Sequence, residues 1–225
     1  MEWIGIETEL TTAVTDLLMA TVALFAIVRI VRSRPRQPIV QRVAIWSIAF
    51  GFLAIAGLLG FFAHGFVLSD AVKNLLWQPL FLSLGLTMSF FAIGVIIDLA
   101  ERPAPRGVIA AFSVAGLGFY ALTLFVSGSF LIFIIYEASI LLFALASYSA
   151  ILIRRREAYA GWMVAGIALS ITAAAIQATG TVLVRVIWEF DHNGIFHIVQ
   201  IVGVLLLLQG IAGRSRLGRK EHHGM

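Results

Sequence analysis

The sequence predicts an all-α membrane protein, a bundle of seven transmembrane helices with its N-terminus outside the cell and its C-terminus in the cytoplasm. Only 12% of the 225 residues are charged and 60% are hydrophobic, whereas a soluble domain has about 25% charged residues. Such a chain cannot cover a water-facing surface with polar side chains. Apolar stretches of about 20 residues, the length that crosses a hydrocarbon core of about 30 Å, recur along the chain. Basic residues fall almost entirely on alternate connections between these stretches.

The apolar stretches follow one another in a regular order. The predicted spans are residues 10–31, 43–67, 72–98, 107–127, 129–153, 160–185 and 194–213. The first follows Met1-Glu2-Trp3, which lacks the basic start of a signal peptide, so we expect it to be retained as a helix. Charged or helix-breaking residues separate most spans, but only Ser127-Gly128-Ser129 divides the fourth from the fifth, which indicates a tight helical hairpin. Residues 1–213 then form the bundle, and residues 214–225 form a basic cytoplasmic tail.

The distribution of Lys and Arg predicts the orientation of the bundle. Fourteen of the sixteen flank odd-numbered connections or lie in the tail, and only Lys73 and Arg185 lie on the other side. Cytoplasmic loops carry the excess of Lys and Arg in membrane proteins, so the odd connections are expected inside. The basic residues therefore reflect membrane topology, and we expect no nucleic-acid partner.

Four ionisable residues stand out at membrane depth in the predicted spans, Asp16, His64, Glu137 and His197, and all four lie in the outer halves. With a rise of about 1.5 Å per residue, Asp16 is about 9 Å and Glu137 about 12 Å from the outer ends of their helices, and His64 and His197 lie nearer those ends. The inner halves hold almost nothing ionisable before the helix ends. Ionisable residues at membrane depth are costly and usually functional. We therefore predict one polar pocket that opens outward between several helices.

Each of these residues also has a purely structural interpretation. His64 can cap its helix near the lipid headgroups, and Asp16 can bond to Thr12 or to a neighbouring helix. Glu137 can pair with Gln177, because polar pairs between helices are common in membrane proteins. The shared depth of the four residues is what favours a functional pocket.

Two histidines at the start of the last span indicate a metal site. Five residues turn a helix by about 500°, so His192 and His197 cannot share a helix face. His192 must precede the helix if both bind one ion, with Asp191 or Asn193 as the N-cap. Imidazole suits Zn²⁺, and a catalytic zinc has three protein ligands and a water. The chain has five histidines, and two of them, His222 and His223, lie in the predicted tail. His64 is therefore the expected third ligand.

Two short motifs carry a family resemblance. They are Phe62-Ala63-His64-Gly65-Phe66 at the end of the second span and His192-Asn193-Gly194-Ile195-Phe196-His197 at the start of the seventh. With the seven-span layout, they resemble the CREST superfamily, which includes alkaline ceramidases and the progestin and adipoQ receptors, and within it a branch of bacterial members. The resemblance implies a zinc ion held by one histidine of span two and two of span seven, hydrolysis of a lipid amide or ester, and a bacterial inner (plasma) membrane.

The sequence departs from the family pattern at three places. The family has His-x-x-x-His in span seven, but Asn193 stands four residues before His197, and His192 is one position off. Gly60 stands where the family has a Ser one turn before the span-two histidine. The acidic residue of span three has no clear counterpart, since the residues near that place are Asn74, Trp77 and Gln78.

Three functions remain open on these grounds. The first is a zinc-dependent membrane hydrolase, in which a metal-activated water attacks a lipid amide or ester and Asp16 or Glu137 is the general base. The second is a non-enzymatic receptor for a lipid or small ligand on the same scaffold, which the missing Ser and acidic residue favour. The third is a transporter, although the chain lacks the internal repeats of many transporters. In the first two functions the partner is a membrane lipid.

The predicted orientation can be tested by cysteine labelling, because the chain has no cysteine of its own. A membrane-impermeant maleimide is expected to label Ser69→Cys in intact cells, since position 69 lies on the outer side. Ser33→Cys is expected to react only after the membrane is permeabilised. Labelling of position 33 in intact cells, with position 69 protected, would show the opposite orientation.

Overall fold

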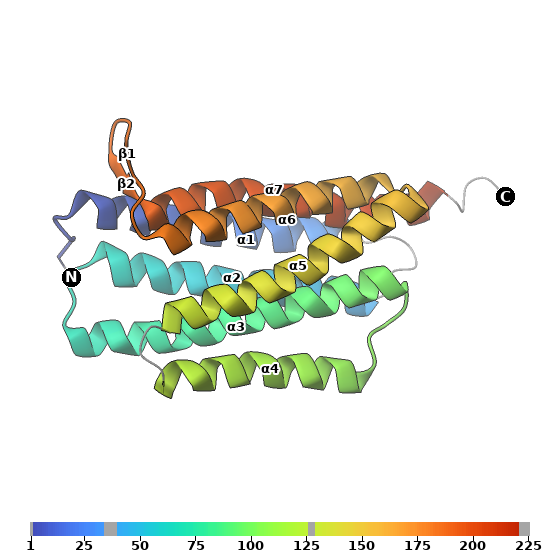
Figure 1. Ribbon diagram of the computed structural model, residues 1–225, viewed down its shortest axis with the longest axis horizontal. Helices are drawn as coiled ribbons and strands as arrows, with labels where there is room; N and C mark the ends of the chain where they lie inside the picture. Colours follow the sequence, from blue (N-terminus) through green and yellow to red (C-terminus); the bar gives the residue numbers. More distant parts are fainter. Residues whose placement is uncertain (1, 34–39, 126–128, 221–225) are drawn as a thin grey trace.

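The helices lie side by side with nearly parallel axes, so the molecule is elongated in one direction (Figure 1). The computed structural model describes residues 2–33, 40–125 and 129–220. These residues form seven long helices: α1 (Glu7–Arg32), α2 (Val40–Gly65), α3 (Asp70–Ala100), α4 (Arg106–Phe125), α5 (Ser129–Arg155), α6 (Ala158–Thr179) and α7 (His192–Lys220). All seven are long and apolar enough to cross a membrane. Among the described residues, the predicted number of spans is therefore confirmed.

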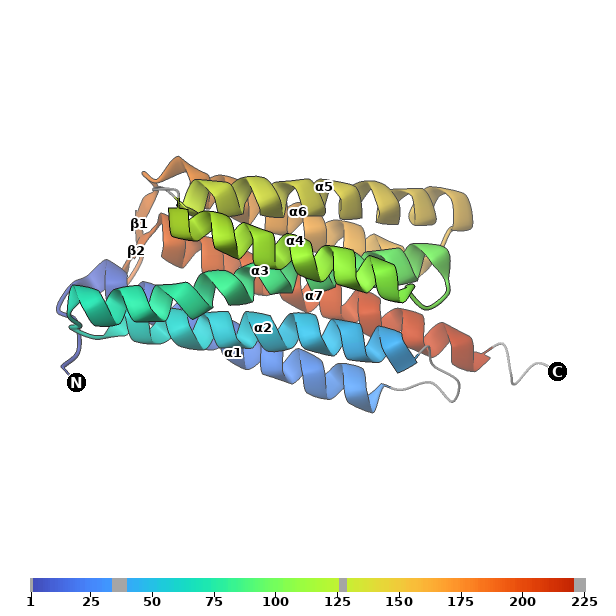
Figure 2. The same cartoon turned by 90° about the horizontal axis from the view of Figure 1, so that it is seen from below.

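The chain reverses direction at each connection between helices. The first residues of α1 and of α7 consequently lie at the same end of the bundle, and α7 ends at the opposite end (Figures 1 and 2). α2 packs against α1 and α3, and α7 packs against α1 and α6, whereas α4 lies at the edge against α3 and α5. Of the predicted fourth connection, residues 126–128 lie outside the described part of the chain. α4 and α5 nevertheless run in opposite directions on either side of it, as a helical hairpin requires.

A short β-hairpin replaces the last part of the predicted sixth span. That span was expected to reach residue 185, but α6 ends at Thr179 because Gly180 takes a left-handed conformation with φ of 64°. The β-branched residues that follow suit a strand, and β1 (Leu183–Arg185) pairs antiparallel with β2 (Glu189–Asp191). The hairpin projects sideways where α7 begins (Figure 1). We call this end of the bundle the hairpin end.

Small residues allow the helices to approach closely. A Cβ at Gly166 of α6 would lie 2.8 Å from the carbonyl oxygen of Gly203 in α7, and one at Gly94 of α3 would lie 2.7 Å from the ring of Trp46. Trp46 is fully buried. Apolar burial cannot drive helices together in lipid, so close packing of this kind holds a membrane bundle together.

The close contact between α6 and α7 predicts that a larger side chain at Gly166 will destabilise the fold. Gly166→Val should lower the free energy of unfolding by about 1–3 kcal/mol, because overpacking forces the helices apart. Gly118→Val is the matched control, since a Cβ at Gly118 of α4 would meet no atom within 4 Å. Unfolding in detergent, followed by helical circular dichroism, measures both. Equal stability of the two variants would contradict the packing argument.

Candidate functional site

A cavity of about 480 Å³ lies between α1, α2, α3, α5, α6 and α7, and most of the side chains around it are apolar. The five side chains selected from the sequence all line it: Asp16, His64, Glu137, His192 and His197. They come from four helices that are distant in the sequence. The structure therefore brings these residues to one cavity, as the common depth of the four intramembrane residues predicted.

Hydrogen bonding fixes the orientation of His197. The hydroxyl of Thr15 on α1 lies 3.0 Å from Nδ1 of the His197 ring. The same hydroxyl lies 2.9 Å from the carbonyl oxygen of Thr12 and 3.0 Å from that of Thr11, so a carbonyl can take its proton. If it does, the Thr15 oxygen accepts from Nδ1 of His197. In that tautomer the other ring nitrogen, Nε2, is left with a free lone pair.

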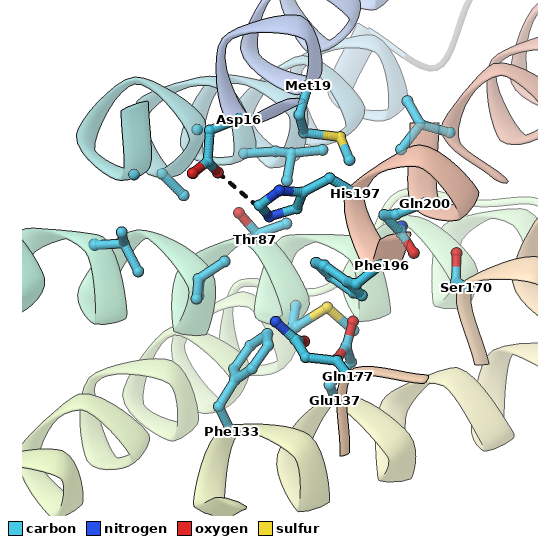
Figure 3. A pocket seen from close by; sticks show the side chains of 18 of the residues that line it. Asp16, Met19, Thr87, Phe133, Glu137, Ser170, Gln177, Phe196, His197 and Gln200 are labelled. Atoms are coloured by element: carbon cyan, nitrogen blue, oxygen red, sulfur yellow. Dashed lines mark ion pairs between the residues drawn. The ribbon is translucent and has the colours of Figure 1, made fainter. Parts of the chain in front are cut away.

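Asp16 lies beside that free nitrogen. Its Oδ1 is 3.3 Å from Nε2 of His197 (Figure 3), and its Oδ2 is buried without a hydrogen-bond partner among the described residues. Asp16 does not bond to Thr12, whose hydroxyl donates to Asp191 instead. In the tautomer with the proton on Nδ1, a carboxylate and a lone pair face each other in a buried place, and both are acceptors. A proton or a cation between them is then needed to make the contact favourable.

Gly60 of α2 leaves the space that the Asp16 carboxylate occupies. A Cβ at position 60 would lie 2.6 Å from both carboxylate oxygens, and one at Gly57 would lie 2.7 Å from the Asp16 carbonyl oxygen. Gly60 is the position where the CREST pattern has Ser. The carboxyl group of Asp16 therefore stands close to where a side chain at position 60 would be.

His64 is held by a residue that sequence analysis did not select. Its Nδ1 lies 2.7 Å from Oε2 of Glu9 on α1, and the edge of its ring meets Trp77 with centroids 5.5 Å apart. The structural interpretation had His64 capping its own helix, whereas the structure pairs His64 with a carboxylate of α1. If Nδ1 donates to Glu9, the lone pair on Nε2 of His64 is available to a ligand.

Asp191 caps α7, as one of the two predicted alternatives. Its Oδ1 accepts a hydrogen bond of 2.9 Å from the backbone nitrogen of Gly194, so α7 begins at His192. The condition that His192 precede the helix is therefore not met. Asn193 is engaged in two further bonds: its Oδ1 accepts from Gln177 at 3.2 Å, and its amide nitrogen donates to Asp191 at 3.3 Å. Asn193 therefore joins α6 to the cap of α7.

Glu137 lies across the cavity from Asp16 and His197 (Figure 3). Its side chain is buried, and its Oε2 has no hydrogen-bond partner in the described part of the chain. The predicted alternative of a Glu137–Gln177 bond is not formed, because the Gln177 amide nitrogen donates to Asn193 and its Oε1 is itself unpartnered among those residues. The buried carboxyl of Glu137 is therefore left facing the cavity.

The described residues contain no group of three or more His, Asp or Glu side chains that is already assembled to hold a metal ion. The three predicted histidine ligands share the cavity, but each imidazole has an acidic neighbour: His64 has Glu9, His192 has Asp191 at 4.0 Å, and His197 has Asp16. The pair that best suits a cation is His197 with Asp16, because the lone pair and the unpartnered carboxylate point to the same place.

A second group of buried charges lies at the other end of the bundle and was missed in the sequence. Asp98 of α3 is fully buried, and it accepts hydrogen bonds from Arg42 at 2.5 and 3.2 Å and from the Tyr148 hydroxyl at 2.8 Å. Arg214 of α7, expected to begin the tail, donates to the Asp98 carbonyl oxygen at 2.6 Å and to the Tyr159 hydroxyl at 2.8 Å. Arg42 and Asp98 lie within two residues of the ends of α2 and α3, so they agree with the expectation that the inner halves hold almost nothing ionisable before the helix ends. Their burial and mutual neutralisation were not predicted.

Comparison with known sequences gives the family but no function. The model of DUF6962, a family of unknown function, matches residues 11–216. The match covers nearly the whole chain, so the chain belongs to this family. No curated protein and no solved structure matches it.

The buried group around Asp98 predicts a strong effect on stability. Asp98→Ala should lower the free energy of unfolding by about 3–5 kcal/mol, because it leaves the Arg42 charge buried without its carboxylate. Glu101→Ala is the matched control: its ion pair with Arg155 is exposed, and such pairs contribute about 0–1 kcal/mol. Unfolding by SDS titration would compare them. Similar losses in the two variants would show that the Asp98 group is not a structural anchor.

Proposed function

We propose that this protein binds a membrane lipid in the central cavity and hydrolyses an amide or ester bond of that lipid with the help of a zinc ion. The single observation that carries the proposal is the pairing of Nε2 of His197 with Oδ1 of Asp16 at 3.3 Å on the cavity wall. The resemblance of the two histidine motifs to the CREST superfamily agrees with it.

The distance between the two atoms suits two neighbours of one tetrahedral ion. Zinc binds nitrogen and oxygen at about 2.0 Å, and two ligands of a tetrahedron with such bonds lie about 3.3 Å apart. The hydrogen bond from His197 to Thr15 is also what a metal-binding histidine needs, because a partner on the other ring nitrogen fixes the tautomer and the ring plane. His197 and His64 would hold the zinc together with Oδ1 of Asp16, whereas His192, five residues before His197 on α7, lies on another face of that helix.

The chemistry divides between the zinc ion and the residues of this chain. Zinc, when bound, supplies an activated water and polarises the carbonyl group of the substrate. Asp16 accepts the proton of the attacking water on its unpartnered Oδ2 and then gives it to the leaving amine or alcohol. Thr15 keeps the His197 ring in place throughout, and Gly60 keeps the space around Asp16 clear.

The substrate class follows from the walls of the cavity. The side chains that surround its polar groups include Phe50, Leu53, Leu84, Phe91, Leu141 and Val204. Walls of this kind accept a hydrocarbon chain and exclude water. We place the protein in a bacterial inner (plasma) membrane with the hairpin end outside, as the basic residues predict, so that a lipid of the outer leaflet enters sideways.

A non-enzymatic receptor for a lipid or small ligand is the second candidate. It is favoured by the observation that the described His, Asp and Glu residues do not already form a group of three that could hold a metal. In a receptor, the lone pair of His197 and the carboxyl group of Asp16 would bind the ligand directly.

Metal analysis of detergent-purified protein tests the proposal. We expect about one zinc ion per chain in the wild type and in a His222→Ala/His223→Ala control, which removes two histidines of the predicted tail. His197→Ala should lose the metal, and Thr15→Val should weaken zinc binding by about 10–100-fold, because it removes the partner that orients His197.

The outcomes separate the candidates. A wild-type protein without zinc, even when zinc is supplied, would refute the hydrolase mechanism. Bound zinc without turnover of any lipid amide or ester would favour the receptor. A loss of zinc in the tail variant would assign the metal to the tail, away from the cavity.

A further inference from the structure

A second group of polar side chains lines the cavity. It consists of Glu137 on α5, Gln177 on α6 and Gln200 on α7, three residues after His197. Glu137 is 5% exposed and Gln177 is 7% exposed. Figure 3 shows Glu137 and Gln177 next to each other, with Asp16 and His197 on the opposite side. The mechanism above uses none of these three side chains.

The unpartnered atoms of this site are all acceptors. Oε2 of Glu137, Oε1 of Gln177 and Oε1 of Gln200 are buried, and none has a hydrogen-bond partner among the residues that the structure describes. Leaving a buried acceptor unpaired costs free energy, and native proteins leave few such groups. Three of them around one cavity, with those of Glu137 and Gln177 next to each other (Figure 3), indicate a ligand that brings hydrogen-bond donors.

We propose that Glu137, Gln177 and Gln200 bind a protonated primary amine at the head of an amphiphilic ligand. An ammonium group has three N–H donors and no acceptor, which complements three acceptor oxygens. Its positive charge also matches the only carboxyl group of the site. This inference depends on the proposed function only in that the cavity holds a lipid-like molecule, and it names the headgroup of that molecule.

Other headgroups fit the site less well. An alcohol brings one donor and no charge, so it leaves acceptors unpaired. A carboxylate or a phosphate brings further acceptors and a negative charge beside Glu137. A quaternary ammonium group has the charge but no N–H to donate. The tail of an alkylamine would lie among the apolar side chains that line the same cavity, including Met88, Leu141 and Leu207.

A series of eight-carbon probes tests the proposal on the purified protein. Octylamine stays protonated at neutral pH, since alkylamines of the lysine type titrate near pH 10.4. We expect it to raise the thermal unfolding midpoint with a saturable dependence on concentration. Octanol, octanoate and octyltrimethylammonium are expected to bind at least about tenfold more weakly, because they lack the charge or the donors of a charge-assisted hydrogen bond.

Variants assign the effect to these three side chains. Glu137→Gln should weaken octylamine binding by at least about tenfold, and Gln177→Leu should weaken it less. Ser139→Ala is the matched control on α5, because the Ser139 hydroxyl bonds only to the carbonyl oxygen of Ile135 on the exposed face of the helix. If Glu137→Gln does not fold, Gln177→Leu and Gln200→Leu with the four probes still decide the question. Equal binding of octylamine and octanol would overturn the proposal.

The same measurements distinguish this inference from the proposed function. His197→Ala should lose zinc and keep its octylamine response, because Glu137, which supplies the negative charge for the ammonium group, lies across the cavity from His197 (Figure 3). A protein that binds no zinc but binds octylamine through Glu137 would refute the hydrolase and leave the amine site standing. A protein that binds zinc and shows no Glu137-dependent preference for octylamine would refute the amine site alone.

Discussion

The hydrogen bond between Thr15 and His197 is the interaction on which the site depends. If the Thr15 hydroxyl gives its own proton to a carbonyl of the preceding turn, it accepts from the ring, and the ring presents its lone pair to Asp16. If Thr15 donates to the ring instead, Nε2 of His197 donates to Asp16. In the first arrangement two acceptors face each other inside the bundle, and a proton, a metal ion or a ligand is needed to join them.

Buried carboxyl groups lie near both ends of the bundle, but their hydrogen bonding differs. Asp98 receives hydrogen bonds from Arg42 and Tyr148, and Arg214 binds its backbone carbonyl, so three helices are fastened to α3. Asp16 and Glu137 are buried at the cavity with oxygens that lack partners among the described residues. A fully paired buried charge stabilises a fold, whereas an unpaired one is retained only where something else satisfies it. This difference separates a structural anchor from a functional site in the same molecule.

The length of the apolar stretches and the positions of the charged residues were enough to predict the helices, because lipid imposes a length and a composition on each span. They were also enough to predict that Asp16, His64, Glu137 and His197 share one level, since depth depends only on position along a helix. Partners could not be predicted in this way. Glu9 contacts His64, and Asp98 contacts Arg42. Both contacts depend on how each helix is rotated about its own axis, which a single sequence does not specify. The hairpin was missed because Leu183, Val184 and Val186 are as suitable for a membrane helix as for a strand.

Hydrogen bonds from α1 hold the start of α7 in position. Thr12 donates to Asp191, which caps α7, and Thr11 donates to the carbonyl oxygen of Glu189 in β2. The backbone nitrogen of Glu189 in turn donates to Glu7. One face of α1 therefore holds the hairpin, the cap and His197 in fixed register, while its next turn supplies Asp16. A ligand bound by both Asp16 and His197 would bridge α1 and α7 at the level where Thr12 and Thr15 already join these helices.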